Sequence, residues 1–177
     1  EKVIQPRLAS TLGERGHDEI DNADTPVIIA GYGRFGQIVS RLLKASGFES
    51  TLLDHDAGQI ELTGRFGNKV FYGDAANVEL LRSAGAGRAR LLVIAIDERE
   101  KAINMIHSVK MQFPNLKVLA RAYDRTHAYE LLHAGADFIT RETFGSALAM
   151  GEEALKLMGL DEARAKRMVS RFDEHDS

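Results

Sequence analysis

The stretch that decides the fold is Val27-Ile28-Ile29-Ala30-Gly31-Tyr32-Gly33-Arg34-Phe35-Gly36. Its apolar half predicts a buried strand, and its G-x-G-x-x-G half opens a predicted helix, which is the context that this motif requires. Gly31 permits a tight turn, Gly33 lets the backbone approach a phosphate, and Gly36 lets the helix lie close to the strand. The start of that helix offers unpaired N–H groups to an anion. The stretch therefore predicts a nucleotide-binding strand–turn–helix.

Outward from this motif, short apolar runs alternate with stretches of helical period. The predicted strands are Val27–Ala30, Ser50–Leu53, Lys69–Tyr72, Leu91–Ile96, Val118–Ala122 and Phe138–Thr140. The predicted helices are 34–46, 57–65, 76–84, 98–112, 125–134 and 143–158. This alternation predicts an α/β fold: a Rossmann-like doubly wound parallel sheet of about six strands, in the order 3-2-1-4-5-6, with an appended C-terminal helical segment.

Length and charge limit the class of protein. The chain has 177 residues, 26 acidic and 23 basic, and no cysteine. Without cysteine there is no disulfide framework, thiolate zinc site or cysteine nucleophile, and the mild net acidity argues against a nucleic-acid partner. We interpret residues 1–25 as a linker from a preceding membrane domain, 26–142 as the Rossmann-like domain, and 143–177 as a helical dimerisation or appendage segment.

Three acidic residues follow predicted strands. Asp54 stands at the end of the second strand, where an acid accepts hydrogen bonds from ribose hydroxyls and repels a 2′-phosphate, so NAD or AMP is favoured over NADP. Asp74 would lie beside the adenosine, and Asp97 beside the point where the strand order reverses. Each has an alternative explanation as a helix cap, Asp54 for a helix starting near Ala57.

The sequence shows no set of catalytic residues to go with the G-x-G-x-x-G motif. A dehydrogenase needs further groups to hold its substrate and move a proton. The sequence contains no Tyr-x-x-x-Lys pair and neither H-x-x-x-H nor H-E-x-x-H. We therefore predict no catalytic residue and no metal site, and a domain that binds a nucleotide without turning it over.

Five stretches carry a more specific pattern. They are Val27–Gln37, Leu53-Asp54-His55-Asp56, Val70–Ala75, Ala120-Arg121-Ala122 and Arg141-Glu142-Thr143-Phe144. Together they resemble the KTN (RCK) domain of the Kef family, the bacterial glutathione-gated potassium efflux systems. The resemblance covers about residues 26–160. The opening Glu1–Leu8 is similar to the stretch that leaves the last membrane helix in that family.

The resemblance implies a regulatory domain at the cytoplasmic face of the bacterial inner membrane. It would be a homodimer that gates the potassium/proton efflux domain of the same polypeptide, with an ancillary subunit resembling quinone oxidoreductases. Glutathione would keep transport closed and glutathione S-conjugates would open it. AMP or NAD(H) would be bound as a regulatory ligand. The expected nucleotide-binding residues are Gly31, Gly33, Arg34, Phe35, Gly36, Asp54, His55, Asp74, Ala75 and Asp97.

A glutathione site should offer arginines, because the planar guanidinium grips a carboxylate with two hydrogen bonds. Arg34, Gln37 and Arg41 fall on one face of the first predicted helix, which we expect to lie largely outside the core. The resemblance singles out Arg41 and Arg141. Phe66 is the candidate for the ring that an S-substituent would displace, because the glycines on either side of it, Gly64 and Gly67, permit it to swing. The alternatives are solvated arginines and a core phenylalanine. The expected glutathione-binding residues are Gln37, Arg41, Phe66, Arg121 and Arg141.

The last predicted helices are rich in apolar residues, among them Phe144, Leu148, Leu155, Leu157, Met158 and Leu160. Such a segment can stay exposed, fold back over the sheet's own face, or pack on a partner. The resemblance to the Kef family favours a second copy as the partner. Two other functions stay open. A KTN domain of another potassium transport system would be gated by nucleotide only. A stand-alone NAD-dependent oxidoreductase would oxidise NADH.

Overall fold

The computed structural model describes residues 26–56, 58 and 68–176. The expected linker 1–25, Phe66 and all of the predicted helix 57–65 except Gly58 lie outside the described residues. The elements are β1 (Val27–Ala30), α2 (Arg34–Ala45), β2 (Ser50–Asp54), β3 (Lys69–Tyr72), α4 (Val78–Ser83), β4 (Leu91–Ile94), α5 (Arg99–Gln112), β5 (Lys117–Ala122), α6 (Arg125–Ala134), β6 (Phe138–Arg141), α7 (Phe144–Leu157) and α8 (Glu162–Asp176).

The six strands form one parallel sheet in the order β3-β2-β1-β4-β5-β6. This confirms the predicted α/β fold and its strand order. The strand β4 is two residues shorter than predicted, because its neighbour β1 ends at Ala30 and the chain then turns away at Gly31. The helix α4 begins two residues later than predicted, because Asn77 caps it.

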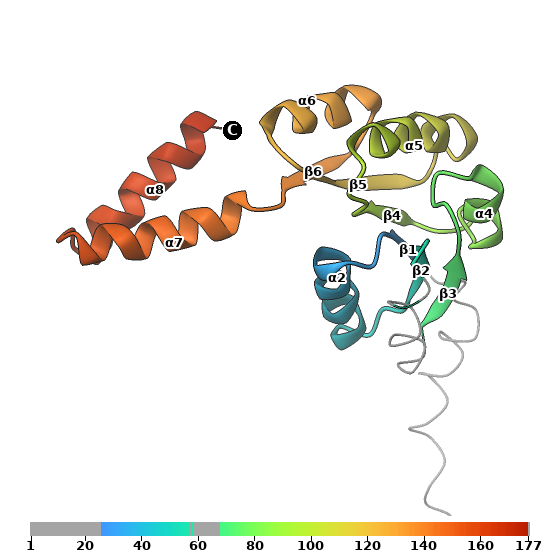
Figure 1. The fold of residues 1–177 in the computed structure, drawn as a ribbon, viewed down its shortest axis with the longest axis horizontal. Helices are drawn as coiled ribbons and strands as arrows, with labels where there is room; N and C mark the ends of the chain where they lie inside the picture. Colours follow the sequence, from blue (N-terminus) through green and yellow to red (C-terminus); the bar gives the residue numbers. More distant parts are fainter. Residues whose placement is uncertain (1–25, 57, 59–67, 177) are drawn as a thin grey trace, which may run out of the picture.

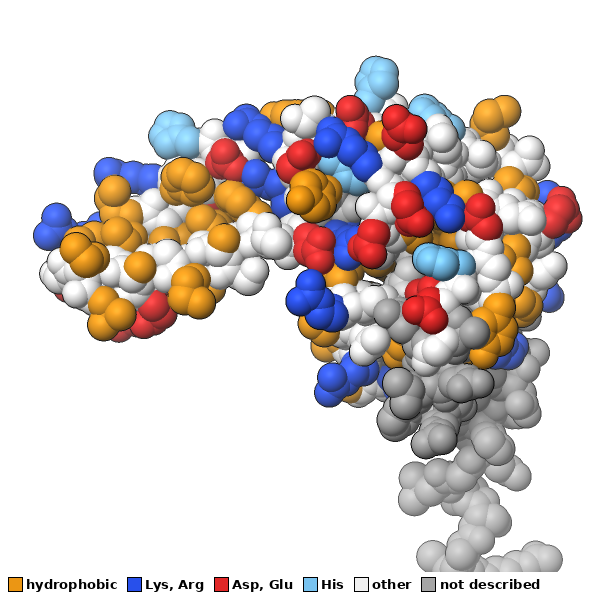
Figure 2. All heavy atoms as spheres, viewed as in Figure 1, with side chains coloured by type: hydrophobic (Ala, Val, Ile, Leu, Met, Phe, Trp, Pro, Cys, Tyr) orange, Lys and Arg blue, Asp and Glu red, His pale blue; other side chains and the backbone are white. Residues whose placement is uncertain are grey.

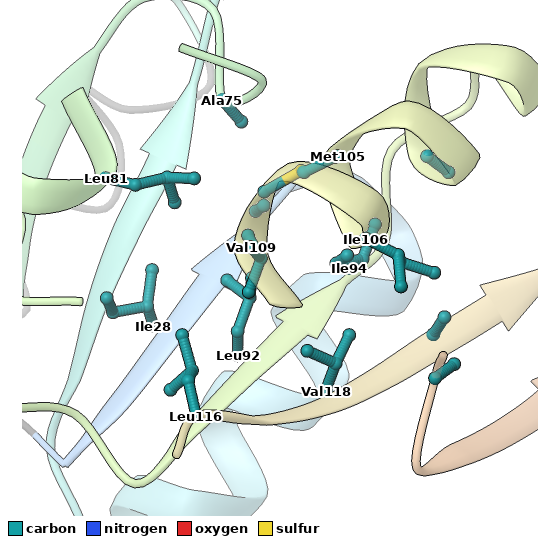
Figure 3. Close-up of a cluster of buried hydrophobic side chains, with 14 of the residues drawn as sticks. Ile28, Ala75, Leu81, Leu92, Ile94, Met105, Ile106, Val109, Leu116 and Val118 are labelled. Atoms are coloured by element: carbon teal, nitrogen blue, oxygen red, sulfur yellow. The ribbon is translucent and has the colours of Figure 1, made fainter. Parts of the chain in front are cut away.

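The sheet separates two layers of helices (Figure 1). Side chains alternate along each strand, so Ile28 faces one layer and Ile29 the other. The larger core lies under α4, α5 and α6, where Leu92, Met105 and Val109 are almost fully buried (Figure 3). The smaller core lies under α2. Together the two cores fix the strands whose carboxyl ends carry the predicted site.

The helices α7 and α8, which we call the arm, pack against each other and extend away from the sheet (Figure 1). The helix α7 has no buried residue and α8 has only Ala165. Hydrophobic side chains gather along the surface of the arm (Figure 2), and Leu157 is 89% exposed. The alternative in which this segment covers the sheet's own face is therefore wrong. None of the described helices is long and apolar enough to span a bilayer.

Candidate functional site

The turn after β1 is built from glycines that differ in what surrounds them. Gly31 has φ +94°, and a Cβ there would lie 2.5 Å from the carbonyl oxygen of Ala95. A Cβ on Gly36 would overlap the carbonyl oxygen of Gly31. A Cβ on Gly33 would meet nothing within 4 Å. Packing within the chain therefore excludes side chains at Gly31 and Gly36, whereas Gly33 borders open space, as expected where a ligand approaches the backbone.

The N-terminus of α2 opens onto this space. Its N-cap is Gly33, so no side chain caps the helix, and its first turn holds no acidic residue. The first N–H groups of a helix have no partner within the helix, and they carry the positive end of its dipole. Arg34 is exposed and Phe35 half-buried in the same turn. This end of α2 is therefore available to a phosphate.

Asp54 ends β2 and is 8% exposed. Its Oδ2 accepts a hydrogen bond from the Tyr32 N–H at 2.7 Å, and its Oδ1 accepts one from the Asp56 N–H at 2.8 Å. His55 is exposed, with Nδ1 3.7 Å from Asp54 Oδ1. The carboxylate thus ties the end of β2 to the glycine turn. The helix that Asp54 might cap instead lies outside the described residues.

Asp74 follows β3 and reaches across to α5. Its Oδ1 accepts a hydrogen bond from the Ala76 N–H and forms an ion pair with Lys101 Nζ, each at 2.9 Å. The hydrogen bond from Lys101 lowers the pKa of Asp74, and Asp74 in turn raises the pKa of Lys101. Sequence reasoning missed Lys101, because a lysine within a helix belongs to no motif and its partner lies far away along the chain.

The capping alternatives for two acids are wrong. The N-cap of α4 is Asn77, whose side chain accepts hydrogen bonds from two backbone N–H groups, so Asp74 does not cap that helix. The N-cap of α5 is Glu98 rather than Asp97. Asp97 instead accepts a hydrogen bond from Arg121 at 2.6 Å.

Arg121 on β5 is 7% exposed. Its Nη2 donates to the Ile96 carbonyl at 2.9 Å and to Asp97, and its Nη1 lies 3.4 Å from Glu142 Oε1. The guanidinium carbon stands 5.7 Å from the centre of the Phe35 ring. Arg121 therefore links the end of β4 to the first turn of α2, beside the glycine motif.

A cavity of about 270 Å³ lies between these segments. Six predicted nucleotide residues line it, namely Gly31, Gly33, Asp54, His55, Ala75 and Asp97. Lys101 lines it as well. The other four, Arg34, Phe35, Gly36 and Asp74, stand in the segments that follow β1 and β3, outside the lining. The cavity lies where the strand order reverses between β1 and β4, which is where Rossmann-type domains bind nucleotides.

The expected glutathione residues are spread over both halves of the sheet. Arg41 is exposed on α2, and Gln37 is half-buried with Nε2 donating to the Tyr32 carbonyl at 3.2 Å. Arg141 lies at the end of the edge strand β6, where it contacts Asp176 of α8. The structure therefore does not bring Arg41 and Arg141 into one contact within the described chain.

Comparison with known proteins agrees with this geometry. Residues 27–142 match the TrkA-N domain family, and residues 146–177 match the potassium efflux system KefB C-terminal domain. The chain is 46% identical over 164 residues to the glutathione-regulated potassium-efflux system protein KefC of Salmonella arizonae, and 46% identical over 172 residues to that of Salmonella newport. These matches cover 93% and 96% of this chain but 26% and 28% of the relatives, so the chain spans about a quarter of their length.

Similar solved structures show more closely what kind of domain this chain is. The Shewanella denitrificans Kef CTD in its AMP-bound form has a TM-score of 0.78 and 51% identity, over 85% of this chain and 91% of that one. GsuK bound to ADP has a TM-score of 0.64 and 25% identity, over 73% and 33% of the two chains. The chain belongs to the TrkA-N domain family of Rossmann-type domains. Within that family, it is a Kef C-terminal regulatory domain.

Proposed function

We propose that this domain binds AMP or NAD(H) as a regulatory ligand and gates potassium/proton efflux through a transport domain of the same polypeptide. The observation that carries the proposal is the open space at Gly33, between the uncapped N-terminus of α2 and the buried carboxylate of Asp54. A phosphate would bind at α2, a ribose at Asp54 and an adenine near Ala75. The AMP-bound Kef relative supports this assignment of the ligand.

The first test is calorimetry with AMP. Gly33→Ala should weaken AMP binding at least tenfold without lowering the melting temperature, because the added methyl group meets no protein atom within 4 Å. Asp54→Ala should cost about 1–3 kcal/mol of binding free energy, the range for hydrogen bonds to a charged group. Gly87→Ala is the matched control, since its Cβ also meets nothing within 4 Å and the residue lies outside the cavity lining. Unchanged AMP affinity in both site variants would contradict the proposal.

The domain acts by binding and not by turnover. The relatives with this sequence pattern are named as potassium-efflux proteins, which supports a regulatory role. NADH should therefore bind without being oxidised by carbonyl acceptors. Steady NADH oxidation by the purified chain would favour the oxidoreductase alternative.

Glutathione keeps efflux closed and glutathione S-conjugates open it. The KefC relatives are named as glutathione-regulated, which supports glutathione as the effector. Arg41 and Arg141 supply the guanidinium groups that its carboxylates need. Gln37, Arg121 and Phe66 complete the proposed set. Calorimetry with glutathione and an S-substituted glutathione, in the presence of AMP, checks this. Absence of binding by both would favour the alternative potassium system gated by nucleotide only.

The assembly follows from the exposed apolar surface of the arm. We propose that residues 143–177 form the contact of a homodimer, that residues 26–142 form the nucleotide-binding domain, and that residues 1–25 link it to the membrane domain. The domain would lie at the cytoplasmic face of the bacterial inner membrane and bind the quinone-oxidoreductase-like subunit. Light scattering should give twice the chain mass of 19.5 kDa. A mass of one chain at working concentration would contradict the dimer.

A further inference from the structure

The last turn of α8 is fastened to the sheet by one carboxylate. Asp176 forms an ion pair with Arg141 at the end of β6, and its Oδ1 lies 3.5 Å from Nη1 of Arg125 at the start of α6. Arg141 and Asp176 are 19% and 26% exposed, so the pair is largely sheltered from water. We call this contact the clasp. It closes the arm onto the nucleotide-binding part of the chain.

An aromatic ring stacks on the same arginine, and a second ring stacks on the first. The guanidinium carbon of Arg141 stands 3.5 Å from the centre of the Phe144 ring, and Phe144 stacks on Phe172 with ring centres 6.4 Å apart. Phe172 and Asp176 are four residues apart and therefore share one face of α8. One face of α8 thus supplies both a ring that stacks on Phe144 and a carboxylate that pairs with Arg141. A ligand carboxylate would pair with Arg141 in the same way.

The carboxylate of Asp176 has two cationic partners in the sheet-bearing part of the chain. They are Arg141 at the end of β6 and Arg125 at the start of α6. These two contacts hold Asp176 at the edge of the sheet.

We propose that Asp176 is a built-in carboxylate that occupies the arginine site at Arg141, and that glutathione binds there by displacing it. The inference rests on the proposed function, because it takes Arg141 as an anchor for a glutathione carboxylate. Displacement frees the last turn of α8 from the sheet. Glutathione and its S-conjugates carry the same carboxylates, so both ligands open the clasp, and the difference between them arises elsewhere.

Competition by a tethered group lowers the apparent affinity, because a ligand binds only the fraction of molecules in which Arg141 is free. Removing the competitor must therefore tighten glutathione binding. This sign is opposite to that of a residue that contacts the ligand, whose removal weakens binding. The sign of one substitution therefore separates a competing side chain from a contacting one.

The experiment is calorimetry of glutathione at constant AMP with the 177-residue chain and four variants. Asp176→Asn keeps the shape of the side chain and removes its charge, and it should bind glutathione at least about fivefold more tightly. Glu174→Gln removes a charge from the same turn at an exposed position, and its affinity should stay within about twofold of the parent chain. Arg141→Gln should lose binding, with or without Asp176→Asn.

Each outcome decides one claim. Equal glutathione affinity of the parent and Asp176→Asn, with Arg141→Gln impaired, overturns the clasp and leaves the proposed function standing. An equal gain in Glu174→Gln also overturns it, because the effect is then one of general charge. No binding by any variant, or full binding by Arg141→Gln, overturns the proposed glutathione site and the inference with it. Amide hydrogen exchange gives the second readout: glutathione should speed exchange in the last turn of α8 in the parent chain, and unchanged exchange contradicts displacement.

Discussion

The sheet-bearing part of the chain, residues 26–142, and the arm keep their shapes by different means. In the former, Ile28, Leu92 and Ile106 are inaccessible to water in the core that lies under α4, α5 and α6. In the arm, only Ala165 is buried, and much of what holds it lies at the surface. Glu153 and Glu152 raise the pKa of Lys156 to about 12, and Asp176 pairs with arginines. The first region carries its own core, whereas the second leaves large apolar side chains such as Leu157 exposed.

The largest expected effect is a difference in stability between two leucine-to-alanine variants, one in each region. Leu92→Ala should lower the free energy of unfolding by about 2–5 kcal/mol, because it leaves a cavity in the larger core. Leu157→Ala in the arm should change it by less than about 0.5 kcal/mol in the single chain, because that side chain is 89% exposed there. Urea unfolding of both variants, at protein concentrations low enough for light scattering to give the mass of one chain, checks this. A comparable loss in Leu157→Ala under these conditions would break the comparison and show that the arm packs its apolar side chains within the chain.

A glycine-to-alanine substitution should lower the stability of the sheet-bearing part and raise that of the arm. Gly36→Ala should destabilise the chain by about 1–3 kcal/mol, since its methyl group would overlap the Gly31 carbonyl oxygen and force the backbone apart. Gly151→Ala should stabilise it by about 0.5–1 kcal/mol, because Gly151 lies inside α7 with nothing within 4 Å of the added Cβ and alanine favours helix. Thermal melts of the two variants are the measurement. Shifts of the same sign would show that α7 is packed as closely as α2.

A smaller, pH-dependent effect belongs to the sheet-bearing part alone. His127 is 2% exposed, its Nδ1 accepts a hydrogen bond from the Tyr123 N–H at 3.0 Å, and Arg99, Asp124 and Glu130 surround it. Burial lowers the pKa of His127 below its ordinary 6.5. The unfolded chain therefore binds the proton more readily, and the stabilisation is complete above about pH 6.5 and is lost as the pH falls toward the folded-state pKa.

The check is urea unfolding at about pH 7.5 and about pH 5.5. In His127→Gln, the free energy of unfolding should fall less between these two pH values than it does in the parent chain. One titrating group contributes at most about 1.4 kcal/mol per pH unit to this fall. His133→Gln, an exposed position on the same helix, should behave like the parent chain. Equal pH dependence in all three chains would show that His127 does not remain neutral in the fold.

Local patterns in the sequence were sufficient for the sheet. The G-x-G-x-x-G motif, the strand-and-helix alternation and the distance from Gly36 to Asp54 all act within one or two neighbouring elements. The strand order was therefore predictable, and so was the meeting of Gly31, Gly33 and Asp54 at one cavity. The side of α2 that faces the sheet was harder to predict. That side holds Gly36 and Ser40, because α2 lies close to the sheet, and this leaves Ile38 and Leu42 exposed.

Contacts between distant segments were not predictable. Lys101 of α5 forms an ion pair with Asp74, which follows β3. Asp176 forms one with Arg141 only because α8 returns along α7. Neither pair has a spacing that a helical or strand period would produce. The same holds for Arg121, whose contacts with Asp97 and Phe35 depend on how three elements end at one edge of the sheet.

The single link between β6 and α7 has a mechanical consequence. The helix α7 has 14 residues, so it is about 21 Å long at the rise of an α-helix. A tilt of about 10° where the helix begins would carry its far end through about 4 Å, which makes α7 a lever that magnifies small shifts at the edge of the sheet. While Asp176 holds α8 against Arg141, this lever is pinned at a second point. Once that point is freed, the same small shift produces the full displacement.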